Sequence, residues 1–215
     1  FYSGDDLRFT VPHFENPEGS SFGSGKTLSV KSDSLNNDGR LFAANVLELQ
    51  AQQLNNRGSL QGGALAIDAD TLTNSGQIEQ TGRGTLTVRA DNLDNRQDGI
   101  IGKSPADGKN SGSTGQSSGA TSATAADGHI SVGGTLTNSG RISAAGKLRL
   151  EGGSKIHNAG HIQVEELASR NTLLDNHGHL QADNAWLSGD ALTNYGALIA
   201  GTYHEFRYDR SVTNH

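Results

Sequence analysis

The chain has 215 residues and a formal net charge of −6, from 23 acidic and 17 basic side chains, and it contains no cysteine. The acidic balance argues against nucleic-acid binding, which needs a basic surface. The lack of cysteine excludes disulfides and thiolate metal sites, and no apolar run approaches the length that spans a membrane. Only 33% of the residues are hydrophobic, so a folded core requires that they recur at regular positions.

A seven-residue pattern, apolar-x-Asn-x-Gly-x-apolar, recurs along the chain at intervals of 18 to 21 residues, apart from one interval of 43. A strand-like apolar-x-apolar pattern, such as Leu28-Ser29-Val30, precedes most copies by about seven residues. Units this short cannot bury a core alone, so they must stack on one another. The sequence therefore predicts an all-β fold, a parallel β-helix of about nine coils. The copies begin at Leu35, Leu54, Leu72, Leu93, Leu136, Ile156, Leu174 and Leu192.

Residues 1–24 form the first predicted element. Leu7-Arg8-Phe9 and the stretch Phe14–Gly19 lie 21 residues before their counterparts in the next copy, and this part holds five of the eleven aromatic residues. We predict that residues 1–24 are a degenerate first coil or a lead-in, and that residues 25–215 form the repeat β-helix. Because methionine and a signal peptide are absent and Val212-Thr213-Asn214 begins another copy, we expect a segment of a longer filament.

The interval of 43 residues contains an insertion at residues 103–127, which is rich in Gly, Ser, Thr and Ala and has no periodicity. This composition is typical of a flexible loop. Insertions in repeat proteins tend to project from one face, where they can carry recognition. Both a recognition role and a tolerated linker remain open.

An asparagine occupies the third position of every copy. Its side chain bonds neighbouring backbone in turns, and asparagines stacked coil on coil can form amide ladders. We expect the glycine that follows to supply a positive φ. The pattern therefore predicts structural turns and no substrate site. The column comprises Asn37, Asn56, Asn74, Asn95, Asn138, Asn158, Asn176 and Asn194.

Four aspartates, Asp33, Asp70, Asp91 and Asp190, share another repeat column. Glycan-cleaving β-helices would need two acids that converge beside a groove. These four would instead be spread along the rod, with only Asp70 and Asp91 in neighbouring coils. We interpret them as turn residues, with a cation ladder and catalysis as the other readings.

Four histidines, His157, His161, His177 and His179, lie within 23 residues. His161 and His179 occupy the same column in consecutive coils, so they should stack about one strand spacing apart. Two imidazoles can chelate zinc or form a pH-sensitive pair, with Glu165 or Asp175 assisting. We expect no catalytic residue, no cofactor and no metal site, and His161 and His179 are the candidates if a metal is bound.

The stretch SLNNDGRLFAANVLELQAQQLNNRGSLQGGALAIDADTLTNSGQIEQ, residues 34–80, resembles the repeats of filamentous haemagglutinin and its relatives. The resemblance covers about residues 25–200, interrupted by 103–127. Those relatives are two-partner-secretion exoproteins of Gram-negative bacteria, and they include adhesins and contact-dependent growth inhibition exoproteins. The resemblance implies a right-handed β-helical rod, secreted to the cell surface through an outer-membrane transporter.

These observations predict a structural and interaction segment of a secreted, surface-displayed exoprotein that acts as an adhesin shaft or a toxin-delivery stalk. The segment would be monomeric and would not bind nucleic acid. Contact with a host or target-cell receptor or glycan would involve the insertion or a patch formed by Tyr195, Tyr203, Phe206 and Tyr208. The alternative is a carbohydrate-active β-helix enzyme, a polysaccharide lyase or hydrolase.

Overall fold

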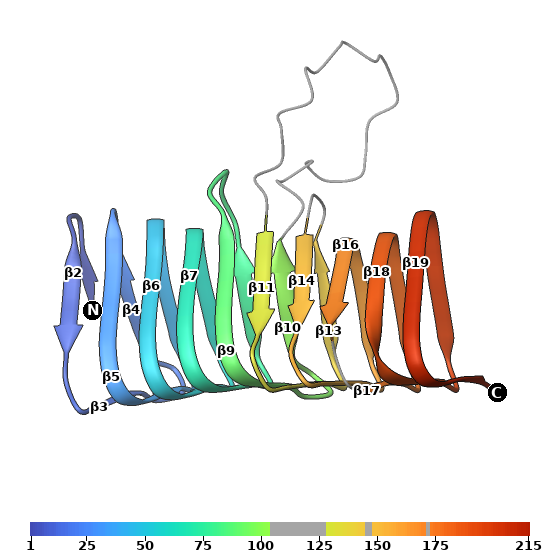
Figure 1. Ribbon diagram of the computed structural model, residues 1–215. Coiled ribbons are helices and arrows are strands. Elements are labelled where there is room, and N and C mark those ends of the chain that lie inside the picture. Colours follow the sequence, from blue (N-terminus) through green and yellow to red (C-terminus); the bar gives the residue numbers. More distant parts are fainter. Residues whose placement is uncertain (104–127, 145–147, 171–172) are drawn as a thin grey trace, which may run out of the picture.

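The computed structural model describes residues 1–103, 128–144, 148–170 and 173–215, and these form a single stack of parallel strands (Figure 1). The predicted insertion 103–127 lies outside the described residues, except for Lys103, which ends a strand. The strands are β1 Tyr2–Ser3, β2 Leu7–Thr10, β3 His13–Asn16, β4 Ser21–Ser24, β5 Thr27–Asn37, β6 Arg40–Asn56, β7 Ser59–Asn74, β8 Gln77–Gln80, β9 Leu86–Asn95, β10 Ile100–Lys103, β11 Gly128–Val132, β12 Thr135–Asn138, β13 Arg141–Ala144, β14 Leu148–Gly152, β15 Lys155–Asn158, β16 His161–Arg170, β17 Leu173–Asn176, β18 His179–Asn194 and β19 Ala197–Asn214.

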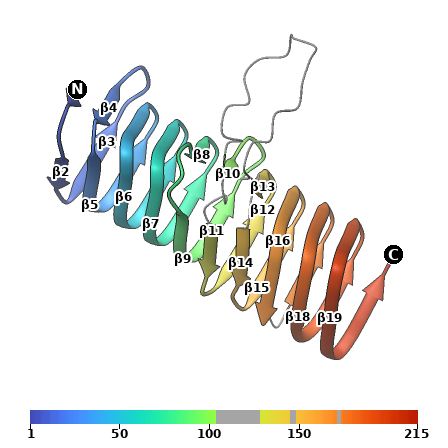
Figure 2. The same ribbon diagram turned by 90° about the horizontal axis from the view of Figure 1, so that it is seen from above.

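Each coil has three short segments. The first carries the apolar-x-apolar pattern, the second carries Leu-x-Asn, and the third follows the motif glycine. Long strands such as β6 and β7 run through a third segment and then through the first two segments of the next coil without a break. Figure 2 shows the coils following one another from the N-terminus to the C-terminus as a rod. The predicted all-β, parallel β-helical fold is confirmed.

Parallel pairing holds equivalent residues of successive coils in register. Leu54 of β6 pairs with Leu35 of β5 and with Leu72 of β7, and Leu72 pairs in turn with Leu93 of β9. Strand alternation turns these side chains inward, because every second residue faces the same side. The eight leading apolar residues of the repeats are at most 3% exposed and belong to one continuous core.

Residues 1–24 stack in the same register as the coils that follow. Phe14 of β3 pairs with Leu35, and Phe22 of β4 pairs with Leu41. The Phe14 and Phe22 rings meet edge to face with centroids 5.5 Å apart, and Phe9 contacts both. These larger side chains fill the N-terminal end of the core. The stack has about ten turns, one more than the sequence predicted.

The expectation of a positive φ at the motif glycines is wrong. Among the described glycines, only Gly19 has one, at 77°. The motif glycines are needed instead because the turns of adjacent coils lie against one another. A Cβ at Gly76 would overlap the carbonyl oxygen of Gly58, and a Cβ at Gly58 would overlap that of Gly39.

No helix that could cross a membrane occurs in the described part of the chain.

The close turn packing predicts that Gly76→Ala destabilises the fold. The added methyl group meets backbone atoms of Arg57 and Gly58, which cannot move aside as a flexible side chain can. Overpacking of this kind lowers the free energy of unfolding by about 1–3 kcal/mol. Thermal unfolding followed by circular dichroism measures the loss. The control is Gly4→Ala, because nothing lies within 4 Å of a Cβ at Gly4. Equal melting temperatures for both variants would contradict the packing argument.

Candidate functional site

A ladder of asparagine side chains runs along the interior of the rod. The eight predicted asparagines, which are at most 6% exposed, belong to it together with Asn16 and Asn214. In each step the side-chain Nδ2 donates to the Oδ1 of the equivalent asparagine in the next coil, over 2.6–2.8 Å. All the bonds therefore point in the same direction along the rod.

The ladder satisfies the hydrogen-bonding capacity of each buried amide. Asn74 accepts from Asn56 at 2.8 Å and donates to Asn95 at 2.8 Å. The same Nδ2 also donates to the Gly76 carbonyl at 3.2 Å and to the Ile100 carbonyl at 3.3 Å. Buried polar groups are tolerated when they are paired in this way.

The N-terminal end of the ladder leaves one acceptor over. Asn16 is 1% exposed, and its Oδ1 has no hydrogen-bond partner among the described residues. One further amide donor at this position would continue the ladder.

The turn surface, meaning the residues directly before and after each ladder asparagine, varies from coil to coil. Arg57 forms a bidentate ion pair with Asp38 of the preceding coil, at 2.6 and 2.8 Å. The hydrogen bonds from Arg57 hold the pKa of Asp38 below its ordinary value. Arg96 pairs with Asp94 at 3.0 Å. These exposed pairs decorate the rod and contribute little to its stability.

A histidine–aspartate cluster lies farther along the turn surface. Nδ1 of His157 is 3.0 Å from one carboxylate oxygen of Asp175, and Nε2 of His177 is 2.9 Å from the other. Among the described residues, these three form the only group of histidine, cysteine or acidic side chains close enough to share a metal ion. The cluster spans two adjacent coils, because His157 pairs with Asp175 across β15 and β17.

His161 and His179, the pair singled out from the sequence, are register partners in consecutive coils. Their rings are parallel within 2°, with centroids 4.6 Å apart. The lone pair of an imidazole nitrogen lies in the ring plane, so two stacked rings do not aim at one ion. The structure brings Asp175 to the other two histidines, and Glu165 is not in the cluster.

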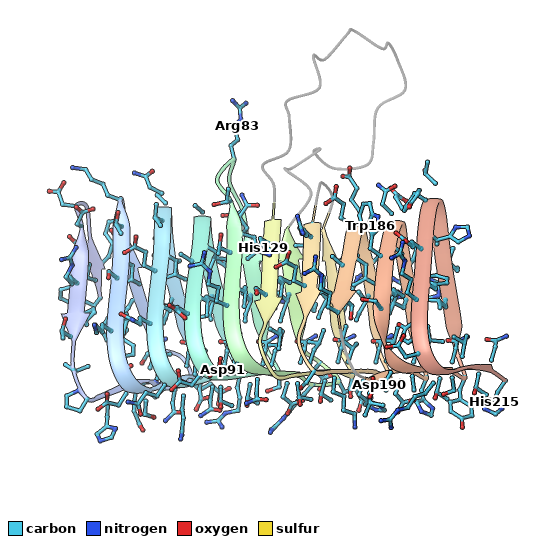
Figure 3. All side chains as sticks on the ribbon, in the orientation of Figure 1. Arg83, Asp91, His129, Trp186, Asp190 and His215 are labelled. Atoms are coloured by element: carbon cyan, nitrogen blue, oxygen red, sulfur yellow. The ribbon has the colours of Figure 1, made fainter. Side chains whose placement is uncertain are left out.

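The aspartate column lies on the outside of the rod. Asp33, Asp70 and Asp91 are exposed, and Asp190 is half-buried, 3.9 Å from Arg210. Figure 3 shows Asp91 and Asp190 well apart along the lower edge of the rod. None of the four belongs to a group of three acidic or histidine side chains near enough to bind one cation.

A groove of about 740 Å³ crosses the outer face of the first segments near the C-terminal end. Trp186 stands at its side, 38% exposed, with its ring 5.6 Å from that of Tyr203. Figure 3 shows Trp186 on the upper part of the rod, away from the lower edge. The groove is lined by Arg149, Glu151, Gly152, Glu166, Ala168, Ser169, Arg170, Trp186, Leu187, Ser188, Glu205 and Arg207.

The aromatic patch expected from the sequence is divided between two places. Tyr203 and Phe206 are exposed on β19, near the groove, and Tyr208 is half-buried against the core. Burial raises the pKa of the Tyr208 hydroxyl. Tyr195 lies instead on the turn surface, stacked on His177 at 4.6 Å. Sequence reasoning missed Trp186, although its place between the inward-facing Ala185 and Leu187 marks it as outward-facing.

The stacked coils and the internal ladder define the class of the protein as a β-solenoid rod. Residues 24–82 match the family model of the haemagglutinin repeat. Toxin CdiA of Escherichia coli is 30% identical over 187 residues, which cover 83% of this chain and 5% of that protein. Deoxyribonuclease CdiA of Dickeya dadantii (strain 3937) is 36% identical over 88 residues, which cover 40% of this chain and 3% of that protein. No solved structure matches the chain.

The chain is a filamentous-haemagglutinin-type repeat region of a two-partner-secretion exoprotein. It spans only 5% and 3% of the length of these two relatives.

The ladder predicts that Asn74→Leu is strongly destabilising although leucine is apolar and of similar size. The substitution leaves a donor hydrogen of Asn56 and the Oδ1 of Asn95 without their partners. Each buried unpaired group costs about 1–3 kcal/mol, so a loss of about 2–6 kcal/mol in unfolding free energy is expected. Denaturant titration measures it. The exposed Asn45 gives the control, Asn45→Leu, and a ladder variant that unfolds together with this control would refute the ladder's role.

Proposed function

We propose that this segment is part of the stalk of a secreted, surface-displayed exoprotein of a Gram-negative bacterium. The supporting observation is the unbroken stack of equivalent leucines and asparagines from coil to coil. Such a stack gives reach and stiffness, since each coil contacts only its neighbours and the same contacts repeat along the axis. The names of the two curated relatives favour a toxin-delivery stalk over an adhesin shaft.

The stack is also suited to export through an outer-membrane two-partner-secretion transporter. The backbone N–H groups of each turn donate to the preceding coil; for example, the Ser59 amide donates to the Gly39 carbonyl at 2.8 Å, and the Gln77 amide donates to the Gly58 carbonyl at 2.8 Å. A coil that has folded therefore presents acceptors to the next one. The sequence has no cysteine, so folding outside the cell needs no disulfide.

The carbohydrate-active enzyme is the less favoured function. Glycoside hydrolysis needs two carboxyl groups within about 5–10 Å of each other on either side of the scissile bond. The aspartate column instead follows an outer edge of the rod. We expect no turnover of uronate polymers or common glycans by this segment.

A stalk whose coils are interchangeable should tolerate the removal of one whole period. Deletion of residues 57–74 joins Asn56 to Ser75 and keeps both the ladder and the core in register, because Asn56 and Asn74 are equivalent, 18 residues apart. We expect unchanged β-sheet circular dichroism, a cooperative melt, and retained export and toxin delivery in the full-length protein.

Deletion of residues 57–65 is the matched control. It removes half of a coil, so inward and outward side chains no longer align with their neighbours. This variant should lose cooperative folding. A whole-coil deletion that folds and is exported, yet abolishes delivery, would show that this coil carries a specific site and would argue against a stalk.

The groove beside Trp186 supports a second role, contact with a glycan on a target cell. An exposed indole face can stack on a sugar ring, and the flanking Arg149, Arg170 and Glu166 can bond to hydroxyl groups. Trp186→Ala should then abolish glycan-array binding by the segment with little effect on its melting temperature. Tyr195→Ala, at an aromatic side chain on the turn surface, is the control. Equal glycan binding by both variants would argue against a role for the groove.

A further inference from the structure

Three potential metal ligands project from the turn surface of two adjacent coils. His157 precedes the ladder residue Asn158 in one coil, and Asp175 and His177 flank Asn176 in the next. Because both asparagines are fixed in the buried ladder, over 2.8 Å, the backbone that carries the three side chains is held in place. The side chains are 33–44% exposed, so an ion from solvent can reach them.

The donor atoms have a composition and a spacing that suit a divalent transition metal. Two imidazole nitrogens and a carboxylate oxygen are a common ligand set for zinc. Nδ1 of His157, Nε2 of His177 and a carboxylate oxygen of Asp175 all lie within 4.8 Å of one another. Tetrahedral zinc with bonds of about 2.0–2.2 Å places its ligand atoms about 3.3–3.5 Å apart, so small side-chain rotations are enough.

The surroundings favour the cluster over the other histidines of the chain. The neighbouring coils place the uncharged Thr137 and Thr193 at the register positions on either side of His157 and Asp175, so no like charge from these positions opposes a cation. The His177 ring stacks on Tyr195 at 4.6 Å, which limits its rotation. The parallel His161 and His179 rings lack both a converging geometry and a carboxylate within the cluster.

We propose that His157, Asp175 and His177 form a binding site for a divalent transition metal ion of the zinc type. The three side chains bind the ion and water completes its coordination. The ion replaces the two histidine–aspartate hydrogen bonds and joins two successive coils of the rod. Since the three ligands are brought together only by coil stacking, the ion binds the folded rod and stabilises it.

Calorimetric titration of the chelator-treated chain with ZnCl2 tests the site, together with the melting temperature with and without zinc. We expect one zinc ion per chain and an upward shift in melting temperature, with neither effect from MgCl2. The double variant His157→Gln/His177→Gln should lose the shift, and its zinc affinity should fall by about tenfold or more. The matched control, His161→Gln/His179→Gln, removes the same number of imidazoles and should bind as the parent does.

Asp175→Asn keeps the shape of the side chain while removing its charge, and it should also weaken zinc binding if the double variant fails to fold. Substitution by Co²⁺ gives an independent signal, because a tetrahedral protein site absorbs strongly in the visible range. Absence of saturable zinc binding by the parent would overturn the proposal. So would binding that survives in the His157/His177 double variant and in Asp175→Asn, or that is lost only in the His161/His179 variant.

Discussion

A carboxamide buried in a protein interior is tolerated only if its N–H and C=O groups are both bonded. In this rod, identical asparagines meet that condition at each coil by bonding to one another. The ladder fixes the height at which each coil meets the next, because a slip of one residue would leave a row of buried amides unpaired. The leucine columns add apolar burial, which is favourable but not directional. The specificity of the stack therefore comes from the amides.

The turn glycines follow from the same constraint. To place one asparagine directly over the next, adjacent turns must lie backbone against backbone, and there is then no space for a Cβ at Gly58 or Gly76. Outward positions are free of this demand. The residue before the ladder asparagine is Thr73 in one coil, Asp94 in the next and His157 farther on. The metal cluster and the Trp186 groove both use such positions, so sites can be added to the rod without disturbing its interior.

The repeat period alone was enough to predict the fold and the inward-facing leucines, because a fixed period with strand alternation admits one way to bury them. The period also set His161 and His179 in one column, but sequence does not determine how two rings are oriented. The cluster of His157, Asp175 and His177 combines the positions before and after the asparagine, and it becomes visible only when both sides of the turn are known. The groove beside Trp186 depends on the small neighbours Ala168 and Ser188, whose depth no pattern reports.

The most direct test of the ladder is hydrogen exchange of its side-chain amides, measured by nuclear magnetic resonance in the folded chain. Amide protons that are buried and bonded exchange only when the surrounding structure opens. The side-chain N–H groups of Asn74 and Asn95 should therefore be protected to the same degree as the backbone amide of Leu72 in the core. The exposed Asn45 gives the rate for a side chain in water. If the Asn74 and Asn95 side chains exchange as fast as that of Asn45 while the Leu72 amide stays protected, the ladder does not hold the coils in register.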